Sequence, residues 1–89
     1  MILTIDVGNT NITCGVFQGD EIAASFRITT KMPRTSDEYG MMLLNLLEQN
    51  DIHPTEIKDA IICSVVPNVM HSLRGGLVKC FHITPIVVE

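Results

Sequence analysis

The residues best suited to chemistry lie between residues 6 and 13, where the sequence reads DVGNTNIT. A single acid, Asp6, follows an apolar, largely β-branched run. A carboxylate at the end of a buried strand is costly unless it is hydrogen-bonded or lies near a cation. Mg²⁺ is a suitable cation, because it binds one or two carboxylates together with waters and phosphate oxygens. The stretch therefore predicts a loop that grips phosphate and metal.

The residues after Asp6 fit that interpretation, but they also fit an ordinary turn. Gly8 has no side chain to keep a phosphate from the backbone. Four neighbours can donate hydrogen bonds, namely Asn9, Thr10, Asn11 and Thr13. However, Gly-Asn is also a hairpin dipeptide, and Asp, Asn and Thr favour turns for local reasons. From these residues alone the two interpretations are about equally supported.

Three strands must position this loop. We expect them at Ile2–Val7, Ile12–Gln18 and Glu21–Thr29, the last two joined by Gly19-Asp20, a two-residue hairpin signal. The first is short and apolar throughout, as is typical of a strand buried on both faces. Short connections predict that the three form an antiparallel meander.

A helix is expected after the loop TTKMPRTS. Thr35 and Glu38 have the spacing of a capping box, in which each side chain caps the backbone of the other. The helix should end near Asn50. An apolar stripe at helical spacing follows the cap and consists of Tyr39, Met42, Leu43, Leu46 and Leu47.

A second strand–helix–strand unit follows. Ala60–Val66 is suited to a central strand, and Pro67 to the first position of a helix. The second helical stripe consists of Met70, Leu73, Leu77, Cys80 and Phe81. Gly75 and Gly76 should weaken that helix by roughly 1 kcal/mol each. Because helical crossovers favour parallel pairing, the order strand-strand-strand-helix-strand-helix-strand predicts an α/β fold with a mixed sheet.

Composition narrows the class of protein. The chain has 89 residues, 46% of them apolar, and a formal net charge of −4. It is one domain at most, and the absence of any Lys/Arg run argues against binding to nucleic acid or anionic membranes. The start MILTID does not resemble a signal peptide, and no apolar run approaches membrane length, so we expect a cytoplasmic protein. The cysteines, Cys14, Cys63 and Cys80, lie in apolar stretches and are expected to be buried thiols.

Three sequence blocks together resemble a known family. IDVGNTN is similar to the first phosphate motif, DxGxT, of the superfamily of acetate kinase, sugar kinases, Hsp70 and actin. With RTSDEYG at 34–40 and SVVP at 64–67, it resembles the type III (CoaX-type) pantothenate kinases along the whole chain. The resemblance implies a ribonuclease H-like/actin-like ATPase half-domain. It also implies transfer of phosphate from ATP to the 4'-hydroxyl of pantothenate, the first step of coenzyme A synthesis, by a homodimer that needs Mg²⁺ and a monovalent cation, K⁺ or NH4⁺.

The resemblance also implies roles for individual residues. Asp6 would be the catalytic residue of this chain and would organise both the metal and the phosphates. The ATP-binding loop would consist of Asp6, Val7, Gly8, Asn9, Thr10, Asn11, Ile12 and Thr13. Residues 1–89 would form the N-terminal, phosphate-binding subdomain. The family's GxDR block with the general base, its K⁺ site and its second domain would follow residue 89, so residues 1–89 alone should be inactive.

Two other functions and two residue roles stay open. A non-catalytic accessory protein of the Baf type would keep the same motifs. A ribonuclease H-like nuclease is less well supported, because a two-metal site needs further carboxylates at neighbouring strand ends. Arg34 could bind phosphate, but we favour a local ion pair with Asp37 or Glu38. Ser64, at the end of a central strand, could meet a ligand, although a hydrogen bond to backbone is the commoner role.

Overall fold

The computed structural model of the chain describes residues 1–64 and 66–88, with Ser64 described by its backbone alone. The elements are β1 (Ile2–Val7), β2 (Asn11–Gln18), β3 (Glu21–Thr29), α1 (Ser36–Gln49), the single 3-10 turn η1 (Pro54–Glu56), β4 (Asp59–Ser64), α2 (Pro67–Phe81) and β5 (Ile86–Val88). The order is the predicted one. Strand β4 ends at Ser64 rather than Val66, and Val65 of the SVVP block lies outside the described residues.

The five strands form one mixed sheet in the order β3-β2-β1-β4-β5. Strands β1, β2 and β3 are antiparallel neighbours, whereas β1, β4 and β5 run parallel. The expected meander and the expected parallel pairing are both confirmed. At the β2–β3 turn Gly19 has a φ of 62°, the left-handed conformation that glycine adopts without steric cost.

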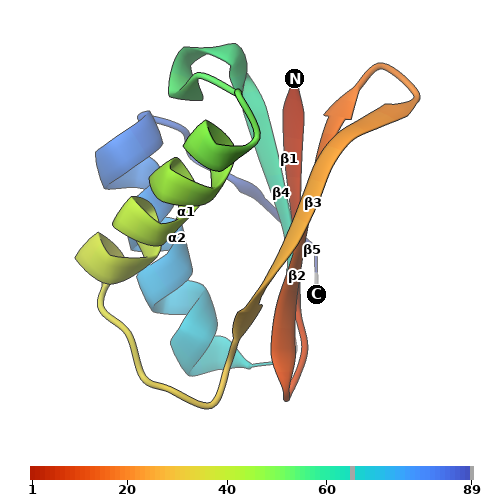
Figure 1. Cartoon of the computed structure of the whole chain (residues 1–89). Coiled ribbons are helices and arrows are strands. Elements are labelled where there is room, and N and C mark those ends of the chain that lie inside the picture. Colours follow the sequence, from red (N-terminus) through yellow and green to blue (C-terminus); the bar gives the residue numbers. More distant parts are fainter. Residues whose placement is uncertain (65, 89) are drawn as a thin grey trace.

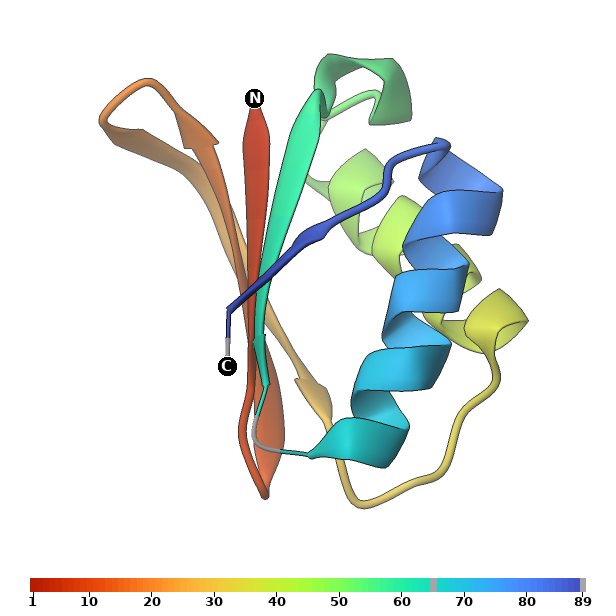
Figure 2. The same ribbon diagram turned by 180° about the vertical axis from the view of Figure 1, so that it is seen from behind.

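The two helices cover the same face of the sheet (Figure 1). Seen from behind, the opposite face carries no helix (Figure 2). Strand β1 alternates accordingly: Leu3, Ile5 and Val7 are buried, whereas Ile2 and Asp6 are exposed. The prediction that β1 is buried on both faces is therefore wrong for this chain, because both crossover helices pack on one side.

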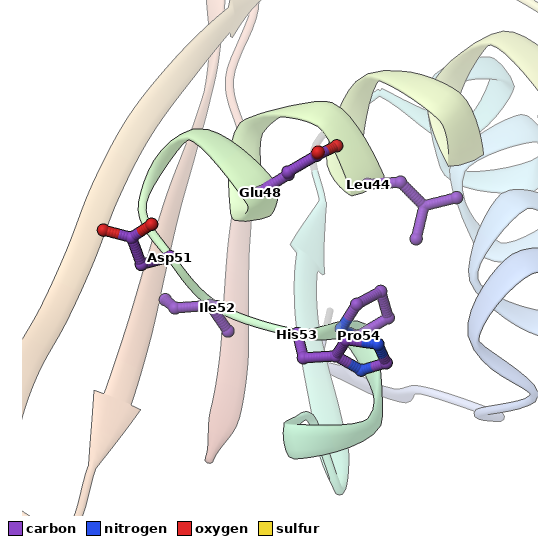
Figure 3. Close-up of a pocket in the computed structure, with 6 residues that line it drawn as sticks. All are labelled: Leu44, Glu48, Asp51, Ile52, His53 and Pro54. Atoms are coloured by element: carbon purple, nitrogen blue, oxygen red, sulfur yellow. The ribbon is translucent and has the colours of Figure 1, made fainter.

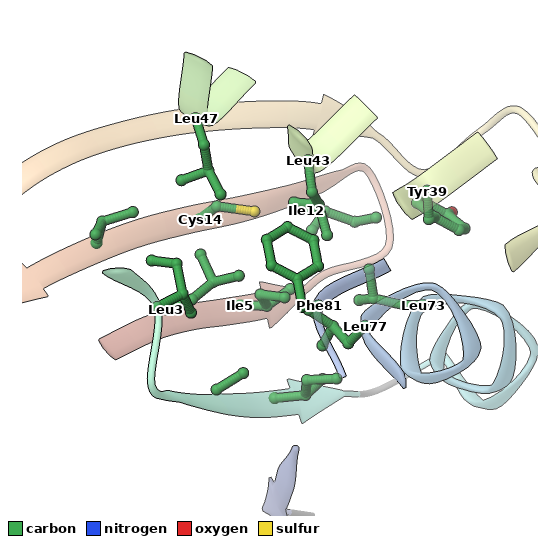
Figure 4. Close-up of a cluster of buried hydrophobic side chains, with 14 of the residues drawn as sticks. Leu3, Ile5, Ile12, Cys14, Tyr39, Leu43, Leu47, Leu73, Leu77 and Phe81 are labelled. Atoms are coloured by element: carbon green, nitrogen blue, oxygen red, sulfur yellow. The ribbon is translucent and has the colours of Figure 1, made fainter. Parts of the chain in front are cut away.

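The core lies between the helices and the covered face (Figure 4). Both predicted helical stripes supply it: α1 contributes Tyr39, Leu43 and Leu47, and α2 contributes Leu73, Leu77 and Phe81, all buried. The sheet contributes Leu3, Ile5, Val7, Ile12, Cys14, Val16 and Ile62. Met42, Leu46, Met70 and Cys80 are only partly buried and pack at the rim of this cluster.

The ends of the helices follow the sequence signals. The Thr35 hydroxyl accepts a hydrogen bond from Glu38 N (3.1 Å), and the Glu38 carboxylate accepts one from Thr35 N (2.8 Å). Asn50 forms the C-cap of α1, and Pro67 is the first residue of α2. The capping box, the end of α1 and the proline start are thus confirmed.

The predicted weakness of α2 at Gly75-Gly76 has a structural explanation. A Cβ atom placed on Gly76 would lie 2.8 Å from Ser36 O and 2.9 Å from Gly40 N, both backbone atoms of α1. A Cβ atom on Gly40 would collide with the Sγ atom of Cys80. The two helices therefore cross in close contact at Gly40 and Gly76, where any larger residue would separate them.

Candidate phosphate-binding site

The loop between β1 and β2 forms the hairpin turn that one of the two interpretations expected. Gly8 N donates to Asn11 O (2.9 Å), directly beyond the last register pair, Val7 with Ile12. A Cβ atom on Gly8 would lie 3.2 Å from Asn11 O. Among the described residues, positive φ values occur only at Gly19, Asp51 and His82. The Gly-Asn dipeptide therefore does not form the left-handed turn that it often forms in hairpins; Gly8 instead allows a close backbone contact.

The end of strand β3 fixes the tip of this hairpin. The Thr30 hydroxyl donates to Asn9 O (2.7 Å), and Thr30 N donates to Thr10 O (3.0 Å). Two carbonyl groups of the tip are thereby hydrogen-bonded within the protein. The exposed side chains of Asn9 and Thr10 take no part in these bonds, so they remain available to a ligand. Sequence reasoning did not identify Thr30, because its contacts lie about twenty residues away along the chain.

Asp6 lies beside the hairpin on the uncovered face of the sheet. Its register partners are Thr13 on β2 and Cys63 on β4. Asp6 is exposed, so the burial cost expected from the sequence does not arise. No described residue makes an ion pair or side-chain hydrogen bond with Asp6. The carboxylate can thus accept a cation without losing a partner among the residues that the structure describes.

The predicted loop residues divide into two groups. The side chains of Asp6, Asn9, Thr10, Asn11 and Thr13 are exposed and can meet a ligand. By contrast, Val7 and Ile12 are 1% and 0% exposed and pack in the core under the helices. These two residues could contact a ligand only through their backbone, and their side chains hold the hairpin against the core.

Arg34 does not make the local ion pair that we favoured. Its Nη1 atom donates to Thr29 O (2.6 Å), and its guanidinium carbon lies 5.9 Å from the centre of the Tyr39 ring. Asp37 instead pairs with Lys79 of α2 (2.7 Å), and both side chains are largely exposed. The Tyr39 side chain is buried in the core. The side chain of Ser64 lies outside the described part of the structure, so its role stays a prediction.

A pocket of about 270 Å³ adjoins the hairpin at Thr30. Lys31 and Arg34 line it from the β3–α1 loop, and Asn68 and Ser72 line it from the start of α2. A larger pocket, of about 550 Å³, lies at the other end of α1 (Figure 3). It is lined there by Glu48 and Asp51, whose charges would repel phosphate. Of these two pockets, the smaller one has the charge that suits an anion.

Two of the three thiols differ from expectation, because Cys63 is exposed and Cys80 is only partly buried. Cys14 is buried, and burial raises its pKa to about 12. Cys63 is exposed, so the expectation that all three cysteines are buried is wrong; Cys63 lies on the uncovered face. Within residues 1–64 and 66–88 no three His, Cys, Asp or Glu side chains gather as a metal site. Within these residues, Asp6 therefore has no companion His, Cys, Asp and Glu side chains that would complete a metal site with it.

Membrane insertion through a helix finds no support in the described residues. None of their helices is long and apolar enough to cross a bilayer. The histidine nearest to a pocket, His53, caps η1: its Nδ1 atom accepts a hydrogen bond from Thr55 N (3.2 Å).

Comparison with known proteins gives a consistent result. The family model for type III pantothenate kinase matches residues 2–89. A type III pantothenate kinase of Agathobacter rectalis is 73% identical over the whole chain, and one of Bifidobacterium longum (strain DJO10A) is 51% identical over 99% of it. The chain spans 34% of the length of each relative. The ROK hexokinase of Thermus thermophilus has a similar fold, with a TM-score of 0.69 at 12% identity over 98% of this chain and 34% of that one.

Proposed function

The chain belongs to the type III pantothenate kinase family, and on that premise we propose that it is the ATP-phosphate-binding part of an enzyme that phosphorylates pantothenate. One observation carries the proposal. Asp6, an exposed carboxylate without a partner among the described residues, lies beside a hairpin tip whose backbone is hydrogen-bonded to Thr30 and whose polar side chains are exposed. Phosphoryl transfer needs mainly positioning and neutralisation of charge, and this arrangement provides the binding half of that task.

Each part of the hairpin has a separate role in this proposal. Gly8 allows the close approach to Asn11 O that shapes the hairpin, and it has no side chain to keep a phosphate from the backbone. The side chains of Asn9, Thr10, Asn11 and Thr13 would donate hydrogen bonds to them. Asp6 fits Mg²⁺ when phosphate oxygens complete the coordination, because Mg²⁺ takes one or two carboxylates in such sites. Bound there, Mg²⁺ would neutralise charge that develops on the phosphates.

The rest of the activity belongs to polypeptide beyond this chain. We assign the general base, the site for K⁺ or NH4⁺ and the second domain to the part of the full-length protein that follows residue 89. Pantothenate and ATP are the proposed substrates, and the proposed assembly is a cytoplasmic homodimer without nucleic-acid or membrane partners. The net charge of −4 supports the absence of nucleic acid, since a polyanion would be repelled.

The ribonuclease H-like alternative receives less support from the structure. A two-metal nuclease needs further carboxylates beside the first. The cross-strand neighbours of Asp6 are Thr13 and Cys63, neither of which supplies one. The Baf-type accessory role keeps the same hairpin, so activity measurements must separate it from the kinase.

The decisive experiment uses a chimera, in which residues 1–89 replace the matched third of the Agathobacter rectalis relative. We expect this chimera to release ADP in a pantothenate-dependent reaction with Mg²⁺ and K⁺ present. Asp6→Asn should abolish turnover without lowering the melting temperature, because Asp6 has no partner among the described residues. The matched control is Asp20→Asn, at the β2–β3 turn, which should keep full activity. A chimera that is folded but releases no ADP would contradict the kinase proposal and favour the accessory role.

A further inference from the structure

One peptide group connects the β3–α1 loop to the β1–β2 hairpin, which lie at the same end of the sheet (Figures 1 and 2). Its carbonyl oxygen, Thr29 O, accepts a hydrogen bond from Nη1 of Arg34 (2.6 Å). Its N–H group, on Thr30, donates to Thr10 O at the hairpin tip (3.0 Å). The Thr30 hydroxyl adds a second bond to the tip, to Asn9 O (2.7 Å). The peptide group between Thr29 and Thr30 is thus held by Arg34 on one side and by the hairpin on the other.

The two hydrogen bonds of this peptide group strengthen each other. A guanidinium donor is charged, and charged donors make shorter and stronger hydrogen bonds than neutral ones. Such a bond polarises the peptide group, which makes its N–H a better donor to the next acceptor in the chain of bonds. Loss of Arg34 should therefore weaken the bond from Thr30 N to Thr10 O as well as the bond that Arg34 makes itself.

Arg34 is also fixed in its own position. The residue that follows it, Thr35, is the N-cap of α1 and forms the capping box with Glu38. The guanidinium carbon of Arg34 lies 5.9 Å from the centre of the Tyr39 ring, within the range of cation–π attraction. Tyr39 is 1% exposed, so this ring belongs to the core. Arg34 therefore connects the core and the start of α1 with the end of β3.

We propose that Arg34 is a positioning residue for the phosphate-binding hairpin and acts through Thr30. By holding Thr29 O, it keeps Thr30 where its two donors fix the hairpin tip. The polar side chains of Asn9 and Thr10 are then in place before a ligand arrives, and groups fixed in advance bind without a cost of ordering. The consequence for ATP binding rests on the proposed kinase function, whereas the consequence for the mobility of the hairpin does not.

Direct contact with phosphate is the alternative role, because Arg34 also lines the 270 Å³ pocket beside the hairpin. The two roles differ in how Arg34 and Thr30 depend on each other. A positioning residue has its effect only while Thr30 can hold the tip. A residue that contacts phosphate itself contributes whether or not the Thr30 hydroxyl is present.

The first measurement is the KM for ATP of the chimera. Arg34→Met keeps the length of the side chain and removes the donor, and Thr30→Val removes only the hydroxyl. Each should raise the KM about three- to tenfold with little change in kcat, as expected for loss of a hydrogen bond that supports binding. Thr55→Val is the matched control, because it removes a hydroxyl that bonds to Nδ1 of His53 (2.8 Å) beside η1. It should leave the KM unchanged.

The double variant Arg34→Met/Thr30→Val separates the two roles. Because both residues act on the same hairpin tip in series, the double variant should raise the KM about as much as the larger single change. Independent contact of Arg34 with phosphate would multiply the two effects, to about ten- to a hundredfold. That multiplication would overturn the positioning role.

Hydrogen–deuterium exchange of the ligand-free chimera gives a measurement that needs no activity. Arg34→Met and Thr30→Val should each speed exchange about threefold or more in the peptide that contains residues 8–11, whereas Thr55→Val should not. An inactive chimera with this faster exchange would contradict the kinase proposal and leave the positioning role supported. Unchanged exchange in Arg34→Met would overturn the positioning role. If Arg34→Met does not fold, unchanged exchange in Thr30→Val would overturn it equally.

Discussion

Replacing Gly76 with alanine should destabilise the protein, although alanine favours a helix. In an isolated helix, Gly→Ala gains about 1 kcal/mol. In this fold the added Cβ atom would lie 2.8 Å from Ser36 O and 2.9 Å from Gly40 N. Both are backbone atoms of α1, so no side chain can rotate away. Relief requires that α1 and α2 separate by about half an ångström, from 2.8 Å toward the ordinary contact range that begins at 3.4 Å.

The cost of that separation exceeds the gain in helix propensity. Overpacking of a well-packed contact typically costs about 1 to 3 kcal/mol, and here the whole helix pair must shift, so we take the upper part of that range. After the gain of about 1 kcal/mol, the net loss is about 1 to 2 kcal/mol. For a domain of this size that loss lowers the melting temperature by roughly 5 to 15 °C. Urea unfolding monitored by circular dichroism measures the free energy directly.

A paired substitution tests whether the contact is the reason. Gly40→Ala should also destabilise, because its Cβ atom would collide with the Cys80 side chain. Cys80→Ala should restore much of that loss, since it removes the colliding atom, but it should not rescue Gly76→Ala. If Gly76→Ala instead raises the free energy of unfolding by about 1 kcal/mol, the substitution changes only the helix propensity of α2. That result would refute the close crossing of the helices.

Two further predictions concern the capping box and the thiols. Thr35→Ala should lower the free energy of unfolding by about 1 kcal/mol, and urea midpoints at neutral pH measure it. Hydrogen bonds from the Thr35 backbone N–H and hydroxyl hold the pKa of Glu38 below its usual value. The Glu38 carboxylate should therefore stabilise the fold fully at pH values above its usual pKa, and this stabilisation should disappear as the pH falls through the lowered pKa. Glu38→Gln should flatten the acid dependence of the unfolding free energy, and an unchanged pH profile in this variant would contradict the prediction. At pH 8 a thiol reagent should modify Cys63 rapidly and Cys14 only on unfolding, because Cys63 is exposed whereas Cys14 is buried with a pKa of about 12. Mass spectrometry locates the label, and rapid labelling of Cys14 in the folded chain would contradict this prediction. ATP with Mg²⁺ should slow the reaction at Cys63, which lies beside Asp6.

Local signals in the sequence were sufficient for most elements. The capping box at Thr35, the proline at the start of α2 and the two-residue turn at Gly19 each depend on residues within one turn of the chain. Their interactions form wherever the backbone adopts that element, so sequence reasoning found them. The order of strands and helices followed from these signals, together with the rule that helical crossovers give parallel neighbours.

The wrong predictions concern contacts between distant segments. Cys63 lies in an apolar stretch, but its side chain faces the side of the sheet that α1 and α2 leave uncovered. The neighbours of Arg34 suggested an ion pair, yet Asp37 pairs with Lys79, forty-two residues later. Whether a polar group finds a partner, or an apolar group is buried, depends on which face of the sheet the helices cover. The packing of the helices on the sheet decides which face that is.

The candidate site shows the same division. The hairpin has an acid, a glycine and several hydrogen-bond donors after a strand. These residue types were enough to predict a phosphate-binding loop and to show a resemblance to one family. The tertiary structure added that Thr30 holds the tip and that Val7 and Ile12 face the core. It also put Asp6 on the uncovered face. Sequence determined which groups are present because it fixes their chemistry and spacing, and only the fold decided their exposure, because exposure depends on what packs against each face of the sheet.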